Sequence, residues 1–198
     1  MQYMMLIYLD EAAAAARSAS EIAAAVASHA PYIERLRANQ RYASSARLAP
    51  ARSARVLRAS DGKPVVTHGP FAESREQLGG FYLIEAPDLD EAIDIARANP
   101  GLQTVATAIE IRPVLRGVAE LPSTGEVQLA RGAEIYSPGW IVLAEPGSAT
   151  TVVRRDGALE LVDGPFRDEA EPVRACRLVP AGSDVTPGAA AIEVRAIL

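Results

Sequence analysis

The sequence has 198 residues, of which 49% are hydrophobic and 23% are charged, and its formal net charge is −5 at pH 7. A chain of this length can bury a core as one large or two small domains, and its acidic balance argues against nucleic acid or an anionic membrane as the main partner. The single cysteine, Cys176, allows no internal disulfide and favours a cytoplasmic location. The apolar run at the N-terminus has no basic residue before it, so we expect no signal peptide. No run approaches the roughly 18 apolar residues that a membrane helix needs, so we expect no membrane helix.

The first half of the chain predicts one complete α+β unit. Apolar periodicity and turn residues predict, in chain order, a strand at 2–9, a helix to about residue 39, strands at about 42–49, 53–58, 64–67 and 78–86, a second helix, and a strand at 103–113. Both helices follow capping sequences, Ser18-x-x-Glu21 and Asp88-x-x-Glu91. The order β-α-β-β-α-β is the ferredoxin-like arrangement.

The first predicted helix carries a histidine among apolar residues. Its buried face is expected to consist of Ile22, Val26, Ile33 and Leu36, with His29 in the same register. The buried side of the second helix is expected to be Leu89, Ala92, Ile93 and Ala96. Pro31 predicts either a kink in the first helix or a late start near Ser28. His29 is therefore either a pocket histidine or a hydrogen-bonded core histidine, and both interpretations stay open.

The second half of the chain repeats parts of the first. At an offset of 95, His68-Gly-Pro-Phe aligns with Asp163-Gly-Pro-Phe, and the turn Asp61-Gly62 aligns with Asp156-Gly157. The segments AIEIRPV (108–114) and AIEVRAI (191–197) align at an offset of 83, so the second copy is shorter where the first has its second helix. We predict an internal duplication, with a complete domain at 1–114 and a degenerate, mostly β repeat at 115–198.

The second copy reads as a sheet without helices. Strands are expected near 127–136, 140–145, 150–155, 159–162, 172–179 and 190–197. A sheet that lacks helical cover has to bury its face against something else. We expect this sheet to pack against the first copy, as a pseudo-dimer, or against a second chain, as a homodimer.

Several of these segments resemble a known family. THGPFAESREQLGGFYLIEAPDLDEAIDIARANP, followed by IEIRPV, is similar to the DGPF domain of the YCII-related proteins, as is the start MQYMMLIYLDE. HAPYIERL resembles the His-x-x-Tyr-Leu pattern of the YCII branch. The resemblance implies a ferredoxin-like fold whose units pair through their sheets as a dimeric α/β barrel. It also implies a link of some members to extracytoplasmic-function sigma factors, and lyase, dehalogenating or isomerase activity in a few relatives.

The resemblance also implies a site. In the YCII branch, a helix histidine and an aspartate before Gly-Pro form a proposed acid–base pair, and the matching histidine here is His29. The aspartate position is His68 in the first copy and Asp163 in the second, so neither copy has a complete pair. One hypothesis is that Asp163 reaches His29 or His68 across the internal interface. The alternative is that His68 is a strand-end residue and Asp163 a turn residue.

Neither a metal nor a cofactor is expected. A metal site made of both histidines with Glu73 or Glu85 would lack ligand spacing of the zinc type. We expect Phe71 in the core and Cys176 as a buried small hydrophobe. A ligand pocket is predicted from residues where the backbone turns tightly or approaches a ligand, and from the helix tyrosine: Tyr32, Gly69, Pro70, Gly79 and Gly80.

Two functions remain open at this stage. The first is a non-catalytic protein that binds a small molecule or serves assembly, with a sigma-factor link implied by the resemblance. The second is a cofactor-free lyase or isomerase that uses His29 and His68 for proton transfer. The two functions differ in whether both histidines face one closed pocket.

Overall fold

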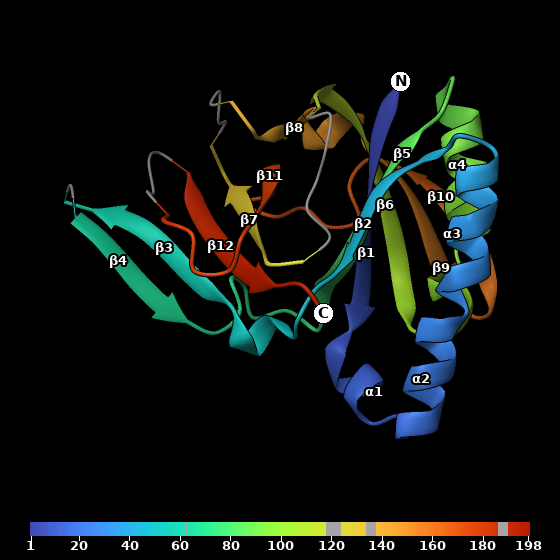
Figure 1. The fold of residues 1–198 in the computed structure, drawn as a ribbon, viewed down its shortest axis with the longest axis horizontal. Coiled ribbons are helices and arrows are strands. Elements are labelled where there is room, and N and C mark those ends of the chain that lie inside the picture. The colour runs from blue at the N-terminus through green and yellow to red at the C-terminus, as the bar shows by residue number, and fades with distance from the viewer. Residues whose placement is uncertain (62, 118–123, 134–137, 186–189) are drawn as a thin grey trace.

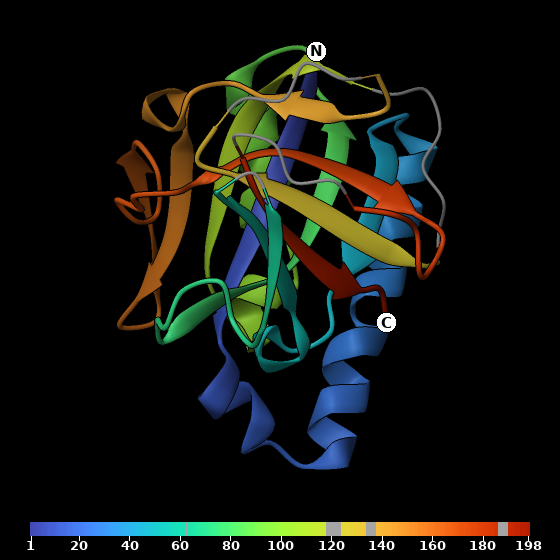
Figure 2. The ribbon, with the colours of Figure 1, turned by 90° about the vertical axis from the view of Figure 1, so that its left-hand side faces the viewer.

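The computed structural model describes residues 1–61, 63–117, 124–133, 138–185 and 190–198. It has the α+β architecture that the sequence predicts, with helices along one side of a curled set of antiparallel strands (Figure 1). Figures 1 and 2 both show the helices nearest the N-terminus extending past the end of the strands.

The first half contains all of the described α-helices. Its elements are β1 (Gln2–Asp10), α1 (Glu11–Ala15), α2 (Ala19–Ala27), α3 (His29–Ala38), β2 (Tyr42–Arg47), the 3-10 turn η1 (Ala51–Ser53), β3 (Arg55–Ser60), β4 (Lys63–His68), β5 (Glu76–Glu85), α4 (Leu89–Arg97), α5 (Gly101–Thr104) and β6 (Ala106–Arg116). The strands β1, β2, β5 and β6, with their intervening helices, follow the ferredoxin-like order, and the β3–β4 hairpin is an addition between β2 and β5.

The second half is built from strands over its described residues. Its elements are β7 (Glu126–Arg131), β8 (Ile141–Leu143), the 3-10 turn η2 (Pro146–Ser148), β9 (Thr150–Arg155), β10 (Ala158–Asp163), β11 (Val173–Val179) and β12 (Ala191–Ala196). Each of the six strands overlaps one predicted from the sequence, and β9 has the predicted bounds of 150–155.

The strands form two sheets that share β6. The first sheet has the order β2-β5-β1-β6-β9-β10, and the second has the order β6-β8-β11-β7-β12-β3-β4. Strand β6 pairs with β9 over residues 108–111 and with β8 through Val114 and Arg116. One long strand therefore carries the hydrogen-bonded ladder from one sheet to the other, with a register shift between Val114 and Arg116.

Each half of the chain contributes a hairpin to the sheet of the other half. The β3–β4 hairpin of the first half pairs with β12, and the β9–β10 hairpin of the second half pairs with β6. In Figure 1 the β3–β4 hairpin projects to the side of the molecule opposite the helices. The two halves are therefore joined by strand pairing as well as by side-chain packing.

Apolar side chains form three layers of core. One lies between the first sheet and helices α3 and α4, a second lies between the two sheets, and a third covers the outer face of the second sheet around Trp140. Cys176 belongs to the core between the sheets and is 3% exposed, and burial raises the pKa of its thiol to about 12. It is the buried small hydrophobe that the sequence predicts.

The two Gly-Pro-Phe loops pack across the boundary between the halves. Phe166 contacts Tyr8 of β1, with ring centroids 5.2 Å apart, and its backbone N–H donates to Glu110 of β6 at 3.0 Å. Phe71 lies between the guanidinium groups of Arg58 and Arg131, each 4.5 Å from its ring centroid. Phe71 is half-buried in this charged sandwich, so its predicted place in the core is wrong.

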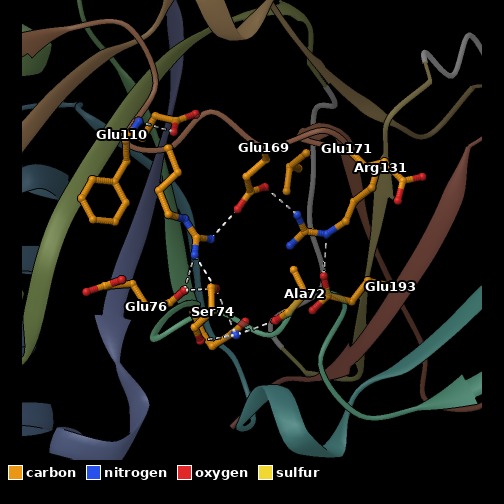
Figure 3. A network of polar contacts seen from close by, with 12 residues as sticks. Ala72, Ser74, Glu76, Glu110, Arg131, Glu169, Glu171 and Glu193 are labelled. Atoms are coloured by element: carbon orange, nitrogen blue, oxygen red, sulfur yellow. Dashed lines mark hydrogen bonds and ion pairs between the residues drawn. The ribbon is translucent and has the colours of Figure 1, made fainter.

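Buried charges tie these loops together (Figure 3). Arg131 donates to Glu193 at 2.6 Å and to Glu169 at 3.1 Å, and Glu169 also accepts from Arg167. Arg167 in turn donates to the carbonyl of Glu76 at 2.6 Å, which reaches the start of β5. Because every one of these ions has an opposite charge or a carbonyl as partner, the network is tolerated inside the fold.

Local sequence explains the helix boundaries. The Ser18 side chain accepts from the N–H of Glu21 and the Glu21 carboxylate accepts from the N–H of Ser18, which is a complete capping box for α2. The helix ends at Ala27 and α3 begins at His29, which places Pro31 in a first turn, where it is tolerated. On α4 the buried residues are Ala92, Ile93, Ile95 and Ala96, whereas the predicted Leu89 is 36% exposed. No helix of the described residues is both long and apolar enough to span a bilayer.

Candidate functional site

A cavity of about 630 Å³ lies between helices α1–α3 and the end of the first sheet. Its apolar lining comes from several separate elements and includes Ile7, Leu9, Ile22, Ile33, Leu48 and Val105. The end of the chain contributes Ile197 and Leu198. A cavity of this size and character is typical of small-molecule sites.

Small residues explain why the space is not filled. The helical segments that line the cavity contribute Ala14, Ala15, Ala25 and Ala30, whose methyl groups are short, and β5 contributes Gly79 and Gly80. Gly79 lies where the β1–β5 register shifts, so it is the extra residue of a β-bulge. A Cβ on Gly80 would lie 2.7 Å from the carbonyl oxygen of Ala46, so β2 can approach β5 closely only because Gly80 has no side chain.

A histidine–tyrosine pair forms the polar part of the cavity wall. His29 begins α3, and its Nδ1 lies 2.6 Å from the hydroxyl of Tyr82 on β5. The Tyr82 ring packs edge-on against Tyr32 with centroids 5.5 Å apart, and the Tyr32 hydroxyl donates to the carbonyl of Ile95 at 2.9 Å. These contacts fix the orientation of Tyr82 and, through the hydrogen bond, that of the His29 ring.

Both members of the pair are held in their neutral forms. Burial, and secondly the positive charge of Arg47, lower the pKa of His29. Burial raises the pKa of Tyr82, so its hydroxyl keeps its proton at neutral pH. Over the described residues the Nε2 atom of His29 makes no hydrogen bond. In the neutral imidazole, Nε2 can accept a hydrogen bond or a proton from a bound molecule when Nδ1 carries the ring proton, and it donates a hydrogen bond when Nε2 carries it.

Three charged side chains line the cavity: Glu11, Arg47 and Arg52. The Glu11 carboxylate is already engaged, because it accepts from the N–H of Ala51 at 2.7 Å and lies 3.6 Å from Arg195. Arg47 and Arg52 are exposed. The cavity therefore presents an apolar interior with positive charge at its rim.

The structure does not bring the three predicted catalytic residues together. His68 ends β4, is exposed, and lies opposite Arg55 in the second sheet, away from the cavity. Asp163 ends β10, is also exposed, and lies opposite Thr150. Strands β1, β6 and β9 separate β10 from Tyr82 on β5, a span of roughly 19 Å at the usual strand spacing. The reason is topological, since both hairpins that precede Gly-Pro-Phe pair with strands of the opposite half.

The predicted pocket residues divide into two groups. Gly79 and Gly80 line the cavity with His29, whereas Tyr32 is buried behind Tyr82. Pro70 lies in a shallower depression with Arg52 and Glu73, and Gly69 follows β4 outside the cavity. Within the described residues, no group of three or more histidine, cysteine, aspartate or glutamate side chains could hold a metal ion.

Sequence reasoning missed Tyr82 and Arg47. Tyr82 could have been found, because alternation along GGFYLIE places Tyr82 on the face that carries Gly80. Arg47 carries no local signal, since its place beside the cavity depends on how β2 pairs with β5.

The fold and the cavity define an α+β protein of ferredoxin-like type with a histidine-containing cavity between helices and sheet. Comparison with family models matches residues 1–117 to the YCII-related domain, so the chain belongs to the YCII-related family. It is also 38% identical over 124 residues to an uncharacterized protein of Rhizobium meliloti (strain 1021), an alignment that covers 62% of this chain and 100% of the relative. The match to the family model ends at residue 117, just after β6.

Proposed function

We propose that this YCII-related protein binds a small, largely apolar molecule in the cavity between α1–α3 and the first sheet, in contact with His29 and Tyr82. The observation that carries the proposal is the 2.6 Å contact between His29 Nδ1 and the Tyr82 hydroxyl at the wall of a cavity of about 630 Å³. An apolar cavity with a few convergent polar groups is the usual form of a ligand site.

The two histidines make this proposal directly testable. In an NMR titration of the whole chain with 4-phenylbutan-1-ol, the ring signals of His29 should shift saturably. The signals of His68, which is exposed on β4, should not move. Shifts of neither histidine, or equal and unsaturated shifts of both, would refute the proposal.

A matched pair of alanine variants shows whether the probe binds in the cavity. Ala30→Leu adds bulk to an alanine that lines the cavity, and Ala23→Leu adds the same bulk to an exposed alanine outside it. Binding should weaken in Ala30→Leu and stay unchanged in Ala23→Leu. Equal weakening in both variants would mean that the probe binds elsewhere.

A second candidate function is proton transfer by His29. The lowered pKa of His29 and its contact with Tyr82 favour a neutral imidazole that can act as a base. If His29 removes a proton from a carbon acid, wild-type protein should catalyse solvent deuterium exchange into a bound small ketone, and His29→Gln should bind the ketone without exchange. A ketone that binds beside His29 without exchange would count against catalysis.

We also infer that the two halves are copies arranged as an internal pseudo-dimer, each lending its hairpin to the other. Reciprocal contacts support this inference. Arg112 of β6 donates to the carbonyls of Ala144 at 3.1 Å and Val173 at 2.5 Å. The residue 83 positions later, Arg195 of β12, donates to the carbonyls of Ala49 and Leu78, both at 2.8 Å. The acceptors of Arg112 lie 95 positions after those of Arg195, which are the two offsets found in the sequence.

Association of two chains and a sigma-factor link stay predictions. The homodimer is tested by sedimentation equilibrium, in which a single monomeric species at micromolar concentration would refute it. The sigma-factor link is a proposal from the family resemblance. It is tested by purifying the protein from native cells, and a preparation that contains no sigma factor would refute it.

A further inference from the structure

Two arginines beside the cavity differ from most others in the protein. Arg41 pairs with Glu91, Arg55 with Glu126 and Arg155 with Glu160, as typical examples of arginines with a carboxylate partner. Arg47 and Arg52 have no ion pair within the described part of the chain, although the protein as a whole is acidic. Exposed cations that remain unpaired next to an apolar cavity are available to a ligand.

The two arginines come from neighbouring elements that border the same cavity. Arg47 is the last residue of β2 and Arg52 lies in the 3-10 turn η1, with Pro50 between them also lining the cavity. The third charged residue of the lining, Glu11, is held by the Ala51 N–H at 2.7 Å. Of the three charged side chains of the lining, two are positive and one is negative, so the side chains of the lining favour an anionic group on a ligand.

From this arrangement we infer that the cavity takes an amphipathic carboxylate, with its carboxylate held by Arg47 and Arg52 and its apolar body inside. This inference rests on the proposed ligand-binding function and adds the charge and orientation of the ligand. A guanidinium group matches a carboxylate with two parallel N–H donors, and such hydrogen bonds are stronger than those between neutral groups. The apolar lining accommodates the rest of the molecule, and the His29–Tyr82 pair can hydrogen-bond one hydroxyl or carbonyl group on it.

His29 also reports on the occupant. The positive charge of Arg47 contributes to the lowered pKa of His29, and burial contributes more. A carboxylate bound at Arg47 would offset that positive charge and so raise the pKa of His29. Glu11 and Arg52 are the other charged side chains of the lining.

The decisive experiment compares 4-phenylbutyrate with 4-phenylbutan-1-ol, which share the apolar part and differ in the anionic group. Both are titrated into the full chain while the His29 and His68 signals are followed by NMR. The carboxylate should bind about tenfold or more tightly than the alcohol, as one charge-assisted hydrogen bond would give. It should also raise the pKa of His29, whereas the alcohol, which adds burial without a charge, should not raise it.

Arginine variants show whether Arg47 and Arg52 cause the preference for the carboxylate over the alcohol. In the double variant Arg47→Gln/Arg52→Gln the two probes should bind with equal affinity. Arg155→Gln, which removes an exposed arginine of the β9–β10 hairpin, should keep the preference. A preference for the carboxylate that persists in the double variant would overturn the inference.

The same titration separates this inference from the proposed function. If both probes shift His29 with equal affinity in wild-type protein, the cavity binds ligands but the anion inference is wrong. If neither probe shifts His29, the proposed function fails and this inference fails with it.

Discussion

The outer faces of the two sheets are covered in different ways. Helices α3 and α4 cover the first sheet, and α1 and α2 extend beyond its end over the cavity (Figure 1). The described part of residues 126–198 has no α-helix, and the second sheet is covered by a cluster around Trp140. A sheet is therefore not enough to make the cavity. The site forms where short alanine side chains leave space against the sheet.

Equivalent positions show the same contrast residue by residue. The offset of 95 relates Gly80 to Ala175, Arg47 to Val142 and Tyr82 to Arg177. Ala175 and Val142 belong to the buried Trp140 cluster, and the Arg177 guanidinium stacks over the Trp140 ring at 4.7 Å. Where the first sheet has a glycine, an exposed arginine and a tyrosine beside a cavity, the second has a packed aromatic cluster.

The largest effect is expected from the two buried arginines, which test whether the halves are equivalent. Arg112→Met and Arg195→Met should each lower the free energy of unfolding by about 3 kcal/mol, because each leaves buried carbonyls without a donor. Urea unfolding measures both variants. Arg155→Met, at an exposed position, serves as the control and should change stability by less than about 0.5 kcal/mol. A large loss in only one of the two buried variants would contradict the proposed equivalence.

The next effect concerns the close approach of β2 to β5. Gly80→Ala should lower the free energy of unfolding by about 1–3 kcal/mol, because the new Cβ would lie 2.7 Å from the Ala46 carbonyl oxygen and the backbone would have to move. Gly79→Ala should cost less, because its Cβ meets the flexible side chain of Leu9. Thermal and urea unfolding give both values. Equal costs at Gly79 and Gly80 would show that β2 can shift away from β5 freely.

A smaller effect is expected from the tyrosine of the site. Tyr82→Phe removes the hydroxyl 2.6 Å from His29 Nδ1 but keeps the ring contact with Tyr32, so stability should fall by about 1 kcal/mol. The His29 ring signals should change in NMR spectra of this variant. Tyr42→Phe, which removes a half-buried hydroxyl near Ser45, should leave those signals unchanged.

The smallest effect is a pH dependence carried by His29. Because the pKa of His29 is lower in the folded chain than in the unfolded one, the unfolded chain binds the proton more readily. The free energy of unfolding should therefore fall as the pH drops from about 6.5, the ordinary pKa of histidine, towards the pKa of His29 in the folded chain. This acid-side loss should be smaller in His29→Gln. Parallel stability curves for wild type and His29→Gln between pH 5 and 7 would contradict it.

Local patterns in the sequence predicted most elements close to their observed bounds. The strands predicted at 150–155 and 172–179 match β9 and β11, and capping sequences predicted the starts of α2 and α4. These signals are local, because a cap or an alternating strand depends on residues within a few positions. The predicted buried face of α4 was partly wrong, since Ile95 is buried and the predicted Leu89 is exposed. Contact of α4 with β6 and β9 decides which of its faces is buried.

Long-range pairing was not readable from the sequence. The resemblance pointed to His29, and the structure places it at a cavity, but the suggested partners His68 and Asp163 lie on hairpins that pair with the other half. Tyr82, the actual neighbour of His29, lies 53 positions away on β5.

Motifs and local patterns in the chain were therefore enough to predict the family, the α+β class and the order of the elements, because these depend on residues close together in sequence. The cavity with His29 and Tyr82 could be located only in the folded chain. Its wall joins α3, β2, β5 and the last residues of the chain, which are far apart in sequence. The pairing of distant strands places those side chains together, and it depends on packing across the whole molecule, which no short segment encodes.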